Sequence, residues 1–245
     1  MQNYCKTIGA LAAASALVAG NASAEVEYEI HTGYSSQYLF RGIDLGDDLV
    51  EVGVDAATEV NGFGLSAGVW AGAFDASTSS YGVTGNDVDN EIDLYLEGSK
   101  DLGFMTAAIG YIYYWNVASL GADNQEVYFQ ASRDLGFASA SLTYFWDVDG
   151  TNGADTEGYT ELALSRSWEL NSCLTLNVGT NVGYLVEGGD FTAWTTKTSL
   201  DWGFVDRAKL SPFVAFSMAL GESTGTAWNE TSNEFVAGSM LSVSF

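Results

Sequence analysis

The sequence is poor in cysteine, proline and basic residues. Its 245 residues include 2 Cys, 1 Pro and 8 Lys or Arg, against 32 Asp or Glu. A disulfide-stapled secreted domain needs more cysteine than this, and binding to nucleic acid needs clustered Lys and Arg. We therefore expect neither a disulfide framework nor a nucleic-acid partner.

Long apolar runs are also missing after residue 24. A transmembrane helix needs about 20 consecutive, mainly apolar residues, and no later segment reaches that length. The chain does contain 28 Gly and 13% aromatic residues. This composition favours strands joined by turns over helices.

The first 24 residues form a separate segment. Lys6 precedes the apolar run Ile8–Gly20, and Ala22-Ser23-Ala24 follows as a small-x-small cleavage pattern. These features are typical of a cleaved secretory signal peptide. We predict a signal peptide at 1–24 and a single mature domain at 25–245.

The mature chain alternates apolar and polar residues in segments of about ten. In the segment 90–99, Ile92, Leu94 and Leu96 alternate with Glu91, Asp93 and Glu97. Strands of a membrane barrel alternate in this way, with apolar residues facing lipid and polar residues facing the lumen. In a soluble core these carboxylates would be buried without partners. Twelve such strands are predicted, with ten or fourteen as alternatives, at residues 25–34, 49–60, 63–74, 90–99, up to 115, 125–133, 138–147, 158–168, 174–186, 191–202, 208–220 and 233–245.

The predicted connections alternate between short and long. Asn61-Gly62 is a two-residue hairpin signal, and the turn sequence at 100–104, Lys-Asp-Leu-Gly-Phe, recurs at 133–137 with Arg first and is echoed at 200–204. The longer connections are 35–48, 75–89, 116–124, 148–157, 187–190 and 221–232. Short turns on one rim and long loops on the other are typical of outer-membrane barrels. The sequence thus predicts an all-β, transmembrane, antiparallel up-and-down barrel of about 12 strands.

Aromatic residues mark the predicted strand ends and the end of the chain. We expect girdles at the level of the lipid headgroups, built from Trp70, Phe74, residues 113–115 and 144–146, Trp168, Trp194 and Trp202. The last strand ends in Phe245 after Leu241 and Val243. An aromatic residue that closes an alternating strand resembles the signal read by the barrel-assembly machinery. We therefore expect that machinery and the lipid of the bacterial outer membrane as partners.

The segment Tyr34-Ser35-Ser36-Gln37-Tyr38-Leu39-Phe40-Arg41-Gly42-Ile43 resembles the S-D-Y-x-F-R-G opening of the TorF-type porin family, a Gcw_chp-like group. Similar segments follow at 61–64, 68–71, 91–95 and 110–114, so the resemblance covers residues 25–129. It implies an outer-membrane barrel with a transport function, and it transfers no catalytic residue.

Acidic residues share the inward-facing positions of the predicted strands. The candidate pore-lining residues are Glu27, Glu29, Glu51, Asp55, Glu91, Asp93, Glu97, Glu126 and Glu161, with Lys197 as the notable cation. A ring of carboxylates in a narrow pore attracts cations. Arg41, in the first long connection, is either a charge at the constriction or a local partner of Asp44 or Asp47.

These residues predict a porin-like channel for passive passage of small hydrophilic solutes, with a weak preference for cations. The alternative is a non-transporting barrel with a structural or surface-binding role through acidic extracellular loops. The sequence leaves open whether the barrel is a homo-oligomer.

The sequence gives little support for an enzyme. A serine hydrolase on a barrel needs a histidine beside a serine and an acid or amide, and His31 is the only histidine. A lone inward-facing histidine is more typical of a polar lumen. The acidic segments 87–91 and 147–150 do not complete a calcium-binding loop. We expect no enzymatic activity, no cofactor and no metal site.

Overall fold

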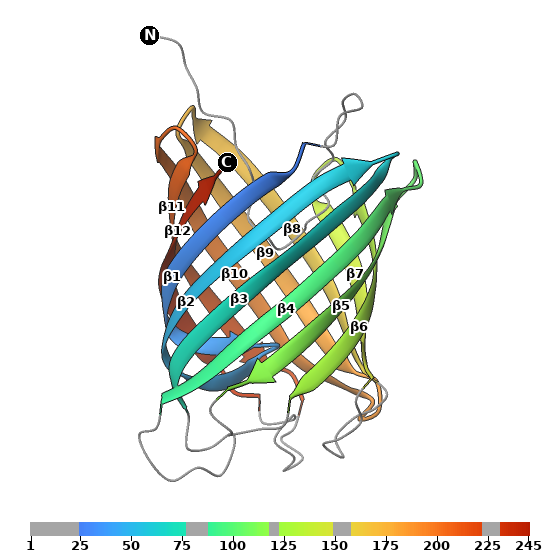
Figure 1. The fold of residues 1–245 in the computed structure, drawn as a ribbon. Coiled ribbons are helices and arrows are strands. Elements are labelled where there is room, and N and C mark those ends of the chain that lie inside the picture. Colours follow the sequence, from blue (N-terminus) through green and yellow to red (C-terminus); the bar gives the residue numbers. More distant parts are fainter. Residues whose placement is uncertain (1–24, 77–87, 118–122, 149–157, 222–230) are drawn as a thin grey trace.

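The chain forms one closed barrel of twelve antiparallel strands, seen in a computed structural model (Figure 1). The structure describes residues 25–76, 88–117, 123–148, 158–221 and 231–245, so the predicted signal peptide lies outside the described residues. Each strand pairs with its neighbours in sequence, and β12 pairs with β1 to close the barrel. Within the described ranges, no helix is long and apolar enough to cross a membrane. The strands are β1 Glu27–Phe40, β2 Ile43–Val60, β3 Phe63–Ala76, β4 Val88–Asp101, β5 Thr106–Asn116, β6 Asn124–Asp134, β7 Ser139–Asp147, β8 Tyr159–Asn171, β9 Leu174–Leu185, β10 Asp190–Val205, β11 Ala208–Ala219 and β12 Glu234–Ser244.

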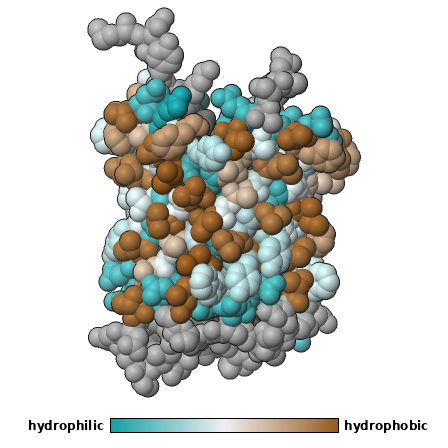
Figure 2. Space-filling model, viewed as in Figure 1, coloured by the Kyte–Doolittle hydropathy of each residue, from teal (hydrophilic) through white to brown (hydrophobic). Residues whose placement is uncertain are grey.

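The predicted two-residue alternation separates the two faces of the wall. On β4, Leu94 and Leu96 are 43% and 56% exposed, whereas the neighbouring Glu91 is only 8% exposed. Hydrophobic residues spread over the outer wall between the two rims (Figure 2). An apolar outer surface of this extent requires lipid as its solvent. The predicted transmembrane barrel of about twelve strands is confirmed.

The short turns follow their predicted chemistry in most places. Asn61 and Gly62 have φ values of 52° and 72°, as a two-residue type I′ turn requires. In the repeated turn, the Gly103 N–H donates to Asp101 Oδ1 at 2.6 Å, and the Gly136 N–H donates to Asp134 Oδ1 at 2.7 Å. The two copies of the repeat therefore build the same turn.

The third copy is not a turn. Asp201 lies within β10, which continues to Val205 and pairs Trp202 with Leu210 on β11. The Asp201 side chain is buried, with Oδ2 3.9 Å from Lys209 Nζ. The echo at 200–204 lacks the basic residue that opens the other two copies, and here the ladder to β11 extends through it.

The first long connection is also not a loop. The predicted loop at 35–48 is wrong, because β1 runs on to Phe40 and β2 begins at Ile43, with Arg41 and Gly42 as a two-residue turn at φ values of 52° and 86°. The β1–β2 register shifts between Tyr38 and Leu39, and such bulges bend a strand. The end of this hairpin turns into the barrel near the long-loop rim (Figure 1).

The aromatic girdle is smaller than predicted. The exposed outer wall carries Trp115, Trp146, Trp168, Trp194 and Trp202. In contrast, four predicted members face the interior by their register, namely Trp70, Phe74, Tyr114 and Phe145. These four are inward because they occupy the same strand positions as the carboxylates, and all four make ring contacts with the β1–β2 hairpin or its arginine.

A charge on the lipid-facing wall tests this arrangement. Leu94→Arg places a cation near the middle of β4 and is expected to lower the free energy of unfolding by about 2–4 kcal/mol, because the bilayer midplane does not solvate it. Leu102→Arg, in a short turn at the rim, is expected to cost about 0–1 kcal/mol. Urea unfolding of the refolded protein in lipid bilayers measures both, and equal losses would contradict the placement of the wall.

Candidate functional site

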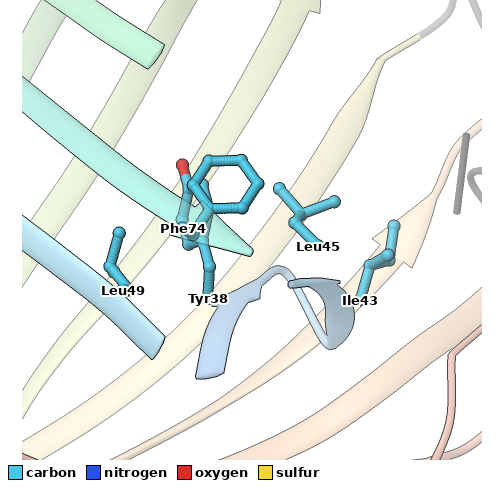
Figure 3. Close-up of a cluster of buried hydrophobic side chains, with 5 residues drawn as sticks. All are labelled: Tyr38, Ile43, Leu45, Leu49 and Phe74. Carbon is cyan, nitrogen blue, oxygen red and sulfur yellow. The ribbon is translucent and has the colours of Figure 1, made fainter. Parts of the chain in front are cut away.

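The end of the first hairpin lies inside the barrel. We call residues 37–46 the tip. Its buried apolar side chains include Tyr38, Ile43 and Leu45, which pack with Leu49 and Phe74 (Figure 3). The Tyr38 ring centroid lies 5.0 Å from that of Phe74 and 5.6 Å from that of Trp70. The inward aromatic residues of β3 therefore support the tip from one side.

Arg41 reaches the opposite wall. Its two terminal nitrogens donate to Oε1 and Oε2 of Glu126 on β6, each at 2.7 Å. Its Cζ atom lies 4.3 Å from the Phe145 ring centroid on β7, 4.6 Å from that of Tyr159 on β8 and 4.7 Å from that of Phe40. These strands lie across the barrel from β1 and β2 in strand order. The tip thus spans the lumen.

The tip also contacts the wall between β10 and β12. A Cβ atom on Gly42 would lie 2.2 Å from the Ala193 Cβ on β10, so this position has no room for a side chain. Its φ of 86° also favours glycine. The Gln37 side-chain amide donates to Glu234 Oε2 on β12 at 2.9 Å. Together with Arg41, these contacts hold the tip against several sides of the lumen.

Neutral aromatic groups orient the luminal carboxylates. A tyrosine hydroxyl or a tryptophan N–H donates to most of them, from the tip, from the same strand or from a strand one or two positions away in the barrel. The pairs are Tyr38 with Glu91 at 2.9 Å, Trp70 with Glu51 at 2.7 Å, Tyr95 with Asp55, Tyr114 with Glu126 at 2.9 Å, Tyr128 with Glu97 at 2.7 Å and Tyr159 with Glu161 at 3.4 Å. Because these donors carry no charge, they fix the carboxylates without neutralising them. We call this set the aromatic–carboxylate wall.

The structure places the candidate residues as follows. Inward-facing positions hold Glu29, Glu51, Asp55, Glu91, Asp93, Glu97, Glu126, Glu161 and Lys197. Glu27 is exposed at the short-turn rim. Arg41 lies in the lumen and pairs with Glu126, whereas Lys197 is exposed to the luminal space with its Nζ 4.0 Å from the Phe213 ring centroid.

The aromatic partners are the part of the site that sequence reasoning missed. Tyr95 stands between Asp93 and Glu97 in the sequence, at the same inward parity, and Tyr114 pairs with Asp93 across β4 and β5. The parity that identified the acids also applied to these tyrosines. For Tyr114, its aromatic character instead led to the girdle assignment.

His31 has an acidic partner but no serine bound to it. Its Nδ1 lies 3.2 Å from Asp55 Oδ2. Ser242 faces His31 across β1 and β12, and no hydrogen bond joins the two side chains. In the ranges that the structure describes, no group of three or more His, Cys, Asp or Glu residues could hold a metal ion. The features of the lumen that the described residues define are its charged side chains, its aromatic rings and the inserted tip.

Comparison with models of protein families assigns the chain to one family. Residues 19–212 match the model of a family described as "Bacterial protein of unknown function (Gcw_chp)". The chain belongs to the Gcw_chp family. This confirms the resemblance based on residues 25–129, and the matched region of this Gcw_chp protein extends well beyond them. No curated protein sequence matches it.

Solved structures share the fold of the Gcw_chp protein at low sequence identity. The COG4313 outer membrane channel from Pseudomonas putida F1 has a TM-score of 0.56 at 12% identity, covering 93% of this chain and 97% of the channel. The KdgM porin has a TM-score of 0.54 at 12% identity, covering 89% and 99%. An active-site variant of outer membrane phospholipase A from Escherichia coli has a TM-score of 0.51 at 16% identity, covering 89% and 90%. These similarities establish the barrel fold, which channels share with an enzyme.

The ion pair of the tip is testable by a double-mutant cycle. Arg41→Met and Glu126→Gln each leave a largely buried charge without its counter-ion, because the two side chains are only 12% and 7% exposed. We expect the double variant to lose less stability than the sum of the single losses, with a coupling free energy of about 2 kcal/mol. Urea unfolding of the four proteins measures it, and additive losses would show that the two side chains do not interact.

Proposed function

We propose that this protein is a porin-like channel of the bacterial outer membrane that passes small hydrophilic solutes and prefers cations. The observation that carries this proposal is the aromatic–carboxylate wall, which lines a closed barrel with charge held by neutral donors. The tip is the constriction of the channel.

The charge balance of the lumen supports the preference for cations. In the part of the chain that the structure describes, the inward-facing wall has two Lys or Arg side chains, Lys197 and Lys209, and the tip adds Arg41. The opposing inward-facing acids of the wall include Glu29, Glu51, Asp55, Asp89, Glu91, Asp93, Glu97, Glu126, Glu161, Asp201 and Glu234. Carboxylates that crowd a narrow pore raise the local concentration of cations and repel anions.

The dimensions support a narrow channel. A barrel of eight strands is filled by its own side chains, whereas barrels of sixteen or more strands leave a wide aqueous channel. Twelve strands leave intermediate room, and the tip occupies part of it. The signal-peptide pattern at 1–24 and the alternating segment Leu241, Val243 and Phe245 support export and assembly in the outer membrane.

The inserted tip also favours the alternative, a barrel that transports nothing. Arg41 and its contacts join the tip to the far wall, and a lumen that stays closed would leave a structural role. The surface-binding form of this alternative depends on acidic loops, of which residues 77–87, 149–157 and 222–230 lie outside the described residues. Single-channel recording separates the two functions, because a barrel that is permanently closed passes no current.

Removal of luminal charge tests the preference for cations. In planar bilayers with a potassium chloride gradient, we expect the reversal potential of the wild type to indicate cation preference. In Glu51→Gln/Glu97→Gln, the permeability ratio should move towards unity, because two fixed charges leave the lumen.

Glu59→Gln/Asp206→Asn serves as the control. It removes the same charge from exposed positions at the short-turn rim, and it should retain the ratio of the wild type. Anion preference in the wild type would refute the proposal, and so would a luminal double variant that behaves like the control.

A further inference from the structure

We propose that the pocket of side chains around the Arg41 guanidinium is a recognition site for solutes that carry a guanidinium group, with Arg41 as its tethered occupant. We call this pocket the guanidinium cage and define it by Glu126, Tyr114, Phe145 and Tyr159. The proposal rests on the proposed channel function and names a class of solute for it.

The cage has the chemistry that a guanidinium requires. Both carboxylate oxygens of Glu126 accept from Arg41 at 2.7 Å, which is the bidentate geometry that a planar guanidinium provides and a single ammonium does not. The rings of Phe145 and Tyr159 lie with their centroids 4.3 and 4.6 Å from Arg41 Cζ, within range of cation–π attraction. The site therefore selects its occupant by both its positive charge and its planar shape.

The cage belongs to the wall and not to the tip. Its four residues come from β5, β6, β7 and β8, and their strand pairing does not involve the first hairpin. The Tyr114 hydroxyl donates to Glu126 Oε2 at 2.9 Å and orients the carboxylate. When Arg41 leaves, the carboxylate and two rings stay in position, so a free solute meets a preformed site.

The surrounding charge draws cations to the cage even when Arg41 occupies it. Glu91 and Asp93 lie on the neighbouring wall, and Asp93 interacts electrostatically with Glu126. The Oδ1 atom of Asp93 is buried and has no hydrogen-bond partner. Glu161 also interacts electrostatically with Arg41, so the cage lies among more acidic side chains than the one that Arg41 pairs with, and a second cation that approaches is attracted.

Competition for the cage links recognition to opening. Arg41 is tethered, so it is present at a high effective concentration and holds the cage against dilute solutes. A guanidinium that enters from the lumen takes the contacts of Arg41, and the tip then loses its ion pair to the far wall. The same contacts that select the solute release the constriction.

The test removes the tethered occupant. In planar bilayers, Arg41→Ala is expected to conduct more than the wild type in potassium chloride. Methylguanidinium chloride should then reduce the current of Arg41→Ala at millimolar concentration, and methylammonium chloride should need at least about tenfold more, because it lacks the bidentate geometry. The wild type should respond less than Arg41→Ala, because its cage is occupied.

Matched double variants locate the effect. Arg41→Ala/Glu126→Gln should lose the preference for methylguanidinium, whereas Arg41→Ala/Glu59→Gln should retain it, because Glu59 is exposed at the rim. Equal potency of the two cations, or full retention of the preference without Glu126, would overturn the proposal.

A second readout does not depend on conductance. The thermal unfolding midpoint of Arg41→Ala in detergent micelles should rise with methylguanidinium more than with methylammonium, since a ligand that binds the folded state stabilises it. If no variant conducts but this difference in unfolding midpoint is present, the proposed channel function is refuted and the proposed guanidinium site is supported. If the variants conduct, but methylguanidinium and methylammonium act equally on both the current and the unfolding midpoint, the proposed guanidinium site is refuted and the proposed channel function is supported.

Discussion

A polypeptide that crosses a bilayer has no water with which to satisfy its backbone. Each N–H and C=O group must find a partner within the protein, and a sheet achieves this only when it has no free edge. Pairing of β12 with β1 removes the edge. The two-residue alternation follows from closure, because each strand then has one face towards lipid and one towards the lumen. The placement of charge, the girdle and the inserted tip all depend on this division.

Much of the barrel was predictable because it depends on local rules. Alternation identified the twelve strands, and Asn61-Gly62 and the repeated Asp-Leu-Gly turns identified three of the hairpin ends. The tip was not predictable in the same way. Arg41-Gly42 lacks the Asn-Gly or Asp-Gly chemistry that marks two-residue turns, and the irregular register between Tyr38 and Leu39 has no comparable sequence signal. The apolar Tyr38, Ile43 and Leu45 were the available signal, since a solvated loop has no need of them.

The acids of the site were predictable by parity, whereas their partners required the structure. Whether Tyr114 belongs to a girdle or to the lumen depends on its register with Asp93. Hydrogen bonds from neutral tyrosines solve a specific problem for such a lumen. Ion pairs would hold the carboxylates equally well, but they would cancel the charge that distinguishes cations from anions. Among the described residues, Glu126 is the luminal carboxylate that pairs with an arginine, and that arginine belongs to the tip.

The position of the tip also constrains the order in which the molecule is built. Arg41 meets a residue 85 positions later in the chain, and Gln37 meets one 197 positions later. The tip therefore gains these contacts only after β6 and β12 have joined the wall. A segment that emerges among the first of the barrel is among the last to reach its final partners. Contacts of such long sequence separation slow folding. The tip of the first hairpin therefore reaches its final packing only after the later strands have paired and closed the barrel.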